Sequence, residues 1–243
     1  MEIQRYREAR RDRGLAVLEG FQPLKHAARF GADILDVVTA DAQRFNALVR
    51  ALAPDLASML PQPPRLVDAT TFSKLAPAPP RTGVIAIARR PENRLDAALA
   101  ADAPIVFLEM PARLENIGTA VRVAAAAGTA ALLTTGTHDP WHPSALRTGV
   151  GLHYAMQVAR VDGLPDGERP VIAFDPDGEP LAPGVSLPSR PILAFGSERA
   201  GLGEAVLERA ALVLRIPMRA GVSSLNLATA VAIALFALSW TRA

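Results

Sequence analysis

The sequence of 243 residues contains no cysteine. This absence excludes disulfide bonds, thiolate-ligated metal sites and cysteine nucleophiles. Histidine is scarce as well, with four residues, of which only His138 and His142 have the i, i+4 spacing of a helical metal-binding pair. Because Pro140 and Pro143 interrupt any helix there, we expect no metal site.

A long hydrophobic run is also missing. The longest apolar run, 230–238, is too short for a membrane span, which needs roughly 20 residues. The charged N-terminus lacks the apolar segment of a signal peptide. We therefore expect a cytoplasmic protein with no membrane association.

Several ligand-binding and catalytic motifs are absent too. The chain has no P-loop, nucleophile elbow or zinc motif. Two glycine pairs, Gly149/Gly151 and Gly201/Gly203, lack the third glycine and the strand-to-helix setting of a dinucleotide fingerprint.

The composition that is present is that of a globular protein. Half of the residues are hydrophobic, 21% are charged and the formal net charge is only +2. Five arginines nevertheless crowd the start of the chain: Arg5, Arg7, Arg10, Arg11 and Arg13. They form either a solvated helix face among interspersed acids or an arm that contacts phosphates.

A proline-rich break at 77–80 divides the chain. Before it, strand patterns at 16–19 and 34–38 alternate with helix patterns at 23–30 and 41–52, and Asp41 stands at a cap position. We predict a small α/β domain over 1–80, a transition over 81–103 that includes a strand at 83–88, and a larger domain over 104–243.

The larger domain alternates continuous apolar strands with helices, which predicts an α/β fold with a parallel sheet covered on both faces. The expected helices are 116–127, 204–210 and 223–240. The expected strands are 105–108, 130–134, 157–161, 171–174, 192–195 and 212–216.

Two segments of this domain carry polar residues beside apolar elements. In the first, Asn116 opens a helix that Gly128 ends, and Arg122 lies two turns in. In the second, Glu198 follows a strand and the turn residue Gly196, at the strand end where open α/β sheets place their sites. Taken singly, Asn116 also suits the N-cap of a helix, Arg122 an ordinary ion pair, and Glu198 a capping role near a helix start.

A third segment contains Ile216, Pro217 and Met218 at the end of a strand. A glycine-bearing loop follows, and a hydrophobic helix then opens near Ser224 and Asn226. This helix is apolar on almost every side, so it needs cover all round. Either a partner subunit covers one side of this helix, or the helix is completely buried within the monomer.

Together, in this order and spacing, the three segments resemble the motifs of the SpoU-type (TrmH-like) methyltransferases of the SPOUT superfamily. The resemblance covers about 105–240, and the Ile-Pro-Met and Ser-Leu-Asn motifs at 216–218 and 224–226 are its most specific part. The stretch 13–20 is similar to the substrate-binding domain of many members that act on ribosomal RNA. Leu114 and Glu115 stand where members often carry Pro-Gly.

The resemblance implies a parallel sheet with a C-terminal trefoil knot, S-adenosylmethionine bound in the knot, and a homodimer. It implies methylation of a ribose 2′-hydroxyl in structured RNA, with the domain at 1–80 binding the RNA. Ribosomal RNA is favoured over transfer RNA because of the N-terminal α/β unit. A catalytically silent RNA-binding protein on the same scaffold is the other alternative.

The resemblance also assigns roles to residues. Arg122 matches the catalytic arginine, Asn116 would position it or the ribose, and Glu198 would fix nearby groups. Ser224 and Asn226 would complete the polar wall. The cofactor-binding residues, acting largely through the backbone, would be Thr134, Thr135, Gly136, Phe195, Gly196, Ile216, Met218 and Leu225.

Overall fold

The computed structural model describes residues 2–182 and 185–240, and it divides into two compact units. The first combines Met1–Glu92 with Trp141–Ala155, and the second combines Asn93–Pro140 with Met156–Ala243. The division after Glu92 falls within the transition expected over 81–103. The inclusion of Trp141–Ala155 in the first unit is a feature for which the sequence carried no signal that we identified.

The first unit is built on a four-stranded sheet of order β1-β4-β2-β3. Strand β4 runs antiparallel to both β1 and β2, whereas β2 and β3 are parallel. The strand pattern at 83–88 therefore belongs to the N-terminal unit, between two of its strands. The bounds are β1 Leu15–Glu19, β2 Ile34–Thr39, β3 Arg65–Leu66 and β4 Val84–Arg89.

Helices complete this unit, and some of them agree closely with the sequence pattern. The Asp41 side chain accepts a hydrogen bond from the amide of Arg44 at 2.9 Å, so the predicted cap is confirmed. The helices are α1 Glu2–Ala9, α2 Phe21–Arg29, α3 Ala42–Leu52, α4 Leu56–Met59, α5 Ala69–Ser73, α8 Pro143–Thr148 and the 3-10 helix η1 Leu152–Ala155.

A buried carboxylate, Glu19 at the end of β1, joins α8 to this unit. Its side chain is only 4% exposed and is paired with Arg10 at 2.7 Å and with Arg147 of α8. Arg147 also donates to the carbonyl of Ala78 at 3.0 Å. Since a buried carboxylate requires charged partners, Arg147 gives α8 a specific position beside β1.

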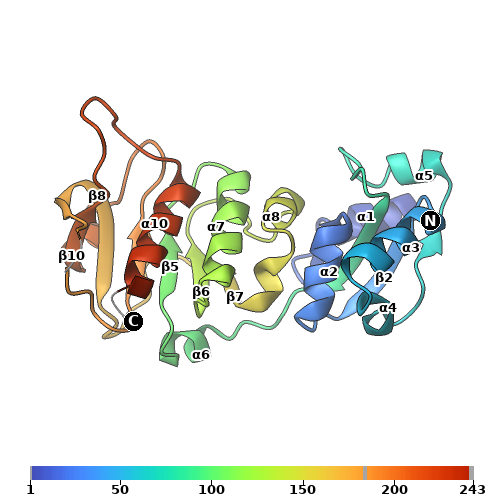
Figure 1. Cartoon of the computed structure of the whole chain (residues 1–243), viewed down its shortest axis with the longest axis horizontal. Helices are drawn as coiled ribbons and strands as arrows, with labels where there is room; N and C mark the ends of the chain where they lie inside the picture. The colour runs from blue at the N-terminus through green and yellow to red at the C-terminus, as the bar shows by residue number, and fades with distance from the viewer. Residues whose placement is uncertain (1, 183–184, 241–243) are drawn as a thin grey trace. The chain divides into compact units, whose positions relative to one another are not determined.

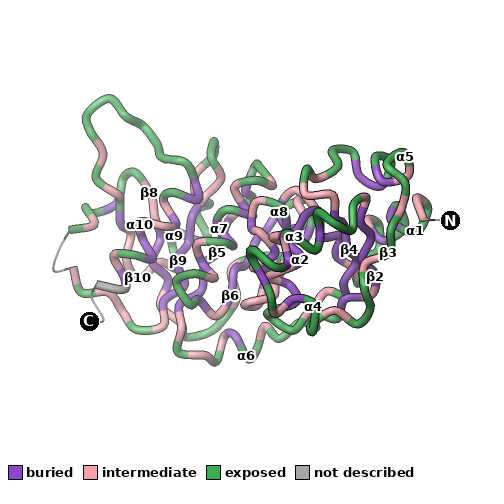
Figure 2. The backbone as a smooth tube through the Cα atoms, turned by 45° about the vertical axis from the view of Figure 1, so that its right-hand side comes forward, coloured by how far each residue is buried: buried purple, intermediate pink, exposed green. Residues whose placement is uncertain are grey.

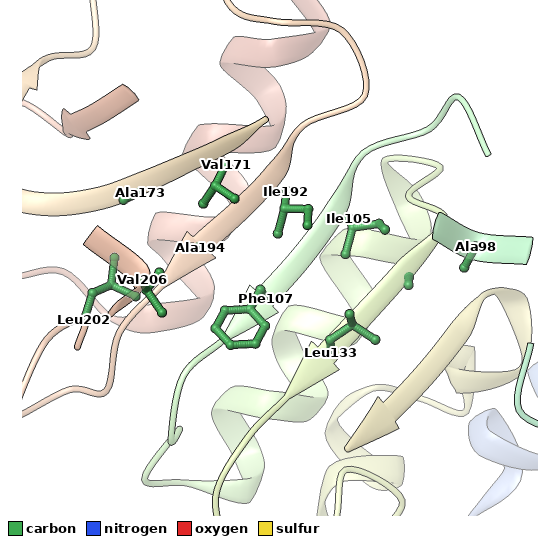
Figure 3. Close-up of a cluster of buried hydrophobic side chains, with 11 residues drawn as sticks. Ala98, Ile105, Phe107, Leu133, Val171, Ala173, Ile192, Ala194, Leu202 and Val206 are labelled. Atoms are coloured by element: carbon green, nitrogen blue, oxygen red, sulfur yellow. The ribbon is translucent and has the colours of Figure 1, made fainter. Parts of the chain in front are cut away.

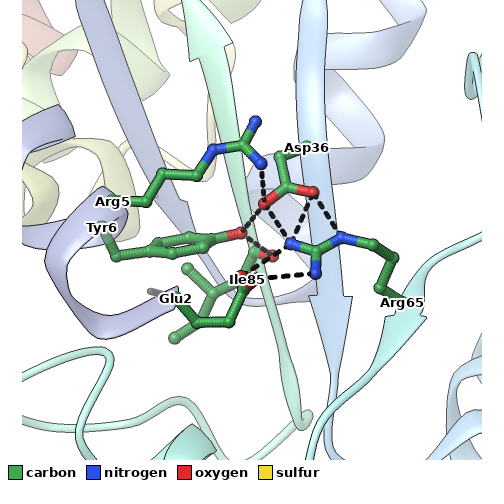
Figure 4. A network of polar contacts seen from close by, with 6 residues as sticks. All are labelled: Glu2, Arg5, Tyr6, Asp36, Arg65 and Ile85. Carbon is green, nitrogen blue, oxygen red and sulfur yellow. Dashed lines mark hydrogen bonds and ion pairs between the residues drawn. The ribbon is translucent and has the colours of Figure 1, made fainter.

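A second polar network fixes α1 against the sheet (Figure 4). Asp36 is 9% exposed and accepts hydrogen bonds from the Tyr6 hydroxyl at 3.2 Å and from Arg65, with 2.8 Å as the shortest distance. Arg65 also binds Glu2 at 2.7 Å, and these hydrogen bonds lower the pKa of Glu2. Burial and then the charge of Asp36 raise the pKa of Tyr6.

The second unit is a six-stranded, all-parallel sheet of order β10-β8-β9-β5-β6-β7, so the predicted parallel α/β domain is confirmed. The strand predicted at 171–174 is longer than its apolar pattern, because β8 continues through Asp175 to Pro180 beside β10. The strands are β5 Ile105–Leu108, β6 Ala131–Thr134, β7 Gln157–Arg160, β8 Val171–Pro180, β9 Ile192–Phe195 and β10 Ala210–Arg215.

Helices cover both faces of this sheet. On one face, Ile105 and Phe107 of β5 pack with Ala98 of α6 (Leu95–Ala100) and Val206 of α9 (Glu204–Glu208) (Figure 3). Alternate strand residues point to the opposite face, where α7 (Leu114–Ala126) and α10 (Leu227–Trp240) lie side by side (Figure 1). The strands β5, β6 and β9 are buried along their whole length, because helices cover both faces of the sheet.

The closing helix differs from its sequence prediction in two respects. It begins at Leu227 rather than Ser223, and the preceding residues 219–226 are exposed (Figure 2). Its residues Val231 and Leu235 are buried, but Thr229 is exposed and Phe236 is 64% exposed. Complete burial within the monomer, one of the two expected covers, is therefore wrong for this helix. Over 2–182 and 185–240, none of the helices is long and apolar enough to cross a membrane.

The Asp36 network predicts a stability effect at Arg65. Replacing Arg65 by Ala removes the guanidinium that binds both Asp36 and Glu2, and leaves a buried carboxylate with weaker partners. We expect Arg65→Ala to lower the free energy of unfolding by about 1–3 kcal/mol, measured by denaturant titration. As a control, Arg81→Ala should change the free energy of unfolding by less than about 0.5 kcal/mol, because Arg81 is exposed and has no hydrogen bond or ion pair within residues 2–182 and 185–240. Equal losses in the two variants would contradict the role given to Arg65.

Candidate functional site

The carboxyl end of β9 and the neighbouring middle part of β8 open into a cavity of about 370 Å³. In open α/β sheets this edge is where ligands bind. The segment between β10 and α10 forms the rest of the wall. The lining residues are 174–176, 195–199, 201, 215–216, 218, 223–225, 227 and 230.

A tight turn after β9 brings the backbone to the cavity. Ser197 and Gly201 exchange backbone hydrogen bonds of 3.1 Å, and the Ser197 hydroxyl accepts from the amide of Ala200 at 3.0 Å. A Cβ atom on Gly196 would lie 1.9 Å from the carbonyl carbon of Gly201. Only glycine fits at 196, so the motif glycine has a steric reason that is independent of any ligand.

Three side chains from separate segments form a chain of hydrogen bonds beside the cavity. The Asn226 amide donates to Asn116 Oδ1 at 2.9 Å, and the Asn116 amide donates to Glu198 Oε1. The backbone amide of Ala112 donates to Glu198 Oε2 at 2.9 Å. Both carboxylate oxygens of Glu198 thus have donors, and three of the predicted catalytic residues are brought into contact.

The donors around Glu198 favour its ionised form. Burial raises the pKa of this carboxyl, but the hydrogen bonds from Ala112 and Asn116 and the charge of Arg113 together lower it below its ordinary value. Glu198 is therefore a carboxylate at neutral pH. It acts as an acceptor that orients the Asn116 amide, and it does not hold a proton to donate.

Asn226 has a second role at the start of α10. Its Oδ1 accepts hydrogen bonds from the amides of Ala228 at 3.0 Å and Thr229 at 3.3 Å. These are the bonds of an N-cap residue, which explains why the helix begins one residue later. The sequence had the helix open near Ser224 and Asn226, and the cap is Asn226.

The cap position expected for Asn116 is wrong. Helix α7 begins at Leu114 with Arg113 as its N-cap residue, so Asn116 lies within the first turn. Leu114 and Glu115 are part of the helix. The acidic side chain of Glu115 is favourable in the first turn, because the N-terminal end of a helix carries a partial positive charge. Asn116 can consequently use its whole amide group toward Glu198 and Asn226.

Arg122 and Ser224, the other two predicted catalytic residues, stand apart from this chain of hydrogen bonds. Arg122 is exposed on α7, and its guanidinium has no hydrogen bond or ion pair within residues 2–182 and 185–240. Ser224 is exposed and lines the cavity. The ordinary ion pair, which was the alternative role for Arg122, is not present among the described residues.

The residues expected to bind a cofactor divide into two groups. Five of them line the cavity: Phe195, Gly196, Ile216, Met218 and Leu225. The strand end at β6 does not contribute to this lining. There Thr134 is buried, and the hydroxyl of Thr135 accepts from the amide of Met110 at 2.9 Å. Gly136, at φ 83°, closely approaches Met110.

The sequence reasoning missed several lining residues. Phe174 stacks on Phe195 with ring centroids 4.8 Å apart, and Asp175 follows it directly at the cavity edge. Arg199 and Arg215 also line the cavity. Asp175 could have been proposed from the sequence, since this acidic residue directly follows the apolar strand predicted at 171–174. The position of Arg215 depends on tertiary packing alone.

The two roles of Asn226 can be separated by mutation. Asn226→Ala removes the cap and the link to Asn116, and we expect it to lower the free energy of unfolding by about 1–2 kcal/mol. Asn226→Asp keeps a capping oxygen but cannot donate to Asn116, so it should recover most of the stability. Denaturant unfolding of both variants tests this. A loss in Asn226→Asp as large as in Asn226→Ala would contradict the capping role.

Comparison with known proteins extends over most of the chain. The chain is 29% identical over 180 residues to the 23S rRNA (guanosine(2553)-2'-O)-methyltransferase of Bacillus subtilis, covering 70% of each protein. It is 33% identical over 168 residues to an uncharacterized tRNA/rRNA methyltransferase of Mycobacterium tuberculosis. That match covers 63% of this chain and only 58% of the relative's length.

A solved structure has a similar fold. The SpoU methyltransferase AviRb from Streptomyces viridochromogenes, in complex with AdoMet, superposes with a TM-score of 0.79 at 23% identity. The alignment covers 99% of this chain and 97% of that one. The profile of the SpoU rRNA Methylase family matches residues 103–236, which span all three motif segments. The chain belongs to the SpoU rRNA Methylase family.

Proposed function

We propose that this protein is an S-adenosylmethionine-dependent RNA methyltransferase that modifies a ribose 2′-hydroxyl, with ribosomal RNA as its substrate. The observation that carries the proposal is the hydrogen-bonded chain Asn226–Asn116–Glu198 beside a cavity at the sheet edge. It joins residues from all three motif segments of the family. The similarity to the Bacillus subtilis protein, which is named as a 23S rRNA 2'-O-methyltransferase, supports the choice of substrate.

The cavity suits the cofactor in chemical character. Ile216, Met218 and Leu225 provide apolar surface for an adenine ring, and the turn after Gly196 provides backbone groups. Charged side chains line the same cavity and could meet charged groups of the cofactor. When bound, S-adenosylmethionine would supply the methyl group from its sulfonium centre.

Arg122 is the residue to which we assign the activation of the ribose. A guanidinium remains protonated at neutral pH, so Arg122 cannot serve as the general base. Arg122 is exposed and has no partner among the described residues, so the N–H groups of its guanidinium are available to the RNA. It would orient the ribose or its phosphate and stabilise the developing alkoxide, while the proton passes to water or a phosphate oxygen.

The polar residues beside the cavity hold the geometry. Asn116 is fixed on both sides by Asn226 and Glu198, so it offers a preorganised wall rather than a mobile amide. Ser224, which lines the cavity, completes that wall toward the substrate. Orientation of this kind can supply roughly 7–11 kcal/mol of a barrier, so positioning alone accounts for much of a methyl transfer.

The C-terminal segment supports the trefoil knot that we propose. Strand β10 lies at the edge of the sheet, yet the following helix α10 packs on α7 and β9 rather than beyond β10. The chain must therefore turn back across the sheet after Arg215. A return of this kind through the loop after β9 would thread the segment 216–226 into a knot, an exception to usual topology.

A homodimer is also part of the proposal. Large apolar side chains in this unit are exposed in the single chain, including Met110, Val222 and Leu225. Val222 and Leu225 belong to the segment that lines the cavity or adjoins it. Packing of two copies through this region would cover these side chains and bring a partner close to the cavity.

The N-terminal unit would bind the RNA. Of its five leading arginines, Arg5 pairs with Asp36 and Arg10 with Glu19. The side chains of Arg7, Arg11 and Arg13 are exposed and have no hydrogen bond or ion pair in the described parts of the chain. These three cations are available for phosphate contacts, which would be weakened by salt.

The substrate assignment is tested by methyl transfer. Purified protein with methyl-labelled S-adenosylmethionine should label unmodified ribosomal RNA in nucleotides whose 2′-oxygen bears the methyl group. Label in transfer RNA instead would establish the alternative substrate. Cofactor and RNA binding without transfer to either RNA would establish a silent RNA-binding protein.

Arg122 provides a sharper test of the chemistry. We expect Arg122→Ala to lower the rate of methyl transfer by about 10²–10³-fold, as loss of a transition-state donor does, while cofactor affinity measured by calorimetry stays unchanged. Arg160→Ala, at the end of β7, is a control for general loss of charge. Normal turnover by Arg122→Ala would refute its catalytic assignment.

A further inference from the structure

The cavity contains charged side chains for which the family motifs give no role. Besides Glu198, its ionisable lining residues are Asp175, Arg199 and Arg215. Glu198 is occupied by Ala112 and Asn116, and Arg215 donates to the carbonyl of Gly178 at 3.0 Å. Asp175 and Arg199 therefore require an explanation.

Both of these residues keep hydrogen-bonding capacity toward the cavity. Asp175 Oδ1 accepts from the amide of Asp177 at 3.0 Å, while Oδ2 has no hydrogen bond within residues 2–182 and 185–240. The Arg199 guanidinium likewise has no hydrogen bond or ion pair in those ranges. One carboxylate oxygen and one guanidinium are thus left for a ligand.

The two residues lie at the same edge of the cavity. Asp175 directly follows Phe174 of β8, and Arg199 belongs to the turn after Phe195 of β9. Phe174 and Phe195 are register partners in neighbouring parallel strands. Asp175 Oδ2 lies 3.8 Å from the position that a Cβ on Gly201 would take, so the carboxylate faces the turn that carries Arg199.

The opposite wall of the cavity is different in character. The segment after β10 and the start of α10 contribute Ile216, Met218, Leu225 and Leu227. The cavity therefore has an apolar wall from the C-terminal segment, and a second wall with an acid from within β8 and a base from the turn after β9. A ligand that fits both walls has an apolar part and a zwitterionic part.

We propose that Asp175 and Arg199 bind the amino-acid end of S-adenosylmethionine. Asp175 accepts hydrogen bonds from the α-ammonium group, and Arg199 donates to the α-carboxylate. The adenosine part carries no formal charge and would not use a guanidinium, whereas the amino-acid end carries one charge of each sign. This proposal rests on the proposed function, because it takes that cofactor as the ligand of the cavity.

The proposal is tested by calorimetry on the full chain with four ligands. These are S-adenosylmethionine, its decarboxylated form without the carboxylate, S-adenosylhomocysteine with a neutral sulfur, and methylthioadenosine without the amino-acid end. Each charge-assisted contact should change Kd by about 10- to 100-fold. The readout is affinity, which is independent of methyl transfer.

For Arg199→Gln, we expect weaker binding of S-adenosylmethionine and unchanged binding of its decarboxylated form. For Asp175→Asn, we expect weaker binding of every ligand that carries the ammonium group, S-adenosylhomocysteine included, and unchanged binding of methylthioadenosine. Asn keeps the oxygen that accepts from the amide of Asp177, so this part of β8 should keep its conformation. Matched controls are Arg219→Gln and Asp177→Asn, which change residues outside the cavity lining.

Two results would overturn the inference. One is an equal loss of affinity for S-adenosylmethionine and its decarboxylated form in Arg199→Gln. The other is weaker binding of methylthioadenosine in Asp175→Asn, which would assign this carboxylate to the ribose. If the unmodified protein binds none of the four ligands, the proposed function itself fails. If it binds them and the two variants behave like their controls, only the present inference fails.

Discussion

The amide group of Asn226 connects the end of the chain to the rest of the site. Its oxygen holds the first turn of α10, and its nitrogen holds Asn116, which in turn holds Glu198. An amide side chain is suited to this position because it has a donor and an acceptor at once. A hydroxyl could cap the helix but would not span both groups, and a carboxylate would repel the oxygen of Asn116. The cavity wall at 223–225 therefore depends on one side chain.

The architecture of the second unit could be predicted because its strands are short, continuous apolar runs. Residues such as Ile105–Leu108 and Ile192–Phe195 have no polar face, and only a sheet buried on both sides accommodates that pattern. Element ends were less predictable. Helix α7 begins at Leu114, two residues before its expected start, and α10 begins at Leu227, directly after its cap residue Asn226.

The site was predictable where a local motif demands a residue type. Gly196 has no room for a side chain, and the Asn226 cap is a short-range feature. Arg199 and Arg215 follow no local rule, since their places in the cavity wall arise from the approach of the turn after β9 and the end of β10. The cofactor-binding role predicted for Thr134–Gly136 shows where a local pattern is insufficient. This strand end has the same sequence pattern as the others, but β9 and β5 separate β6 from β8, and the end of β6 does not line this cavity.

The division of the first unit between two stretches of chain has a consequence for the evolution of such proteins. A terminal domain can be exchanged by recombination at one junction, but Met1–Glu92 is completed by Trp141–Ala155. An ancestor that acquired a different N-terminal stretch at a single junction would have kept an Arg147 with no Glu19 to meet it. Replacement of this unit requires two coordinated changes. The loop between β6 and β7 should therefore co-vary with β1 among relatives.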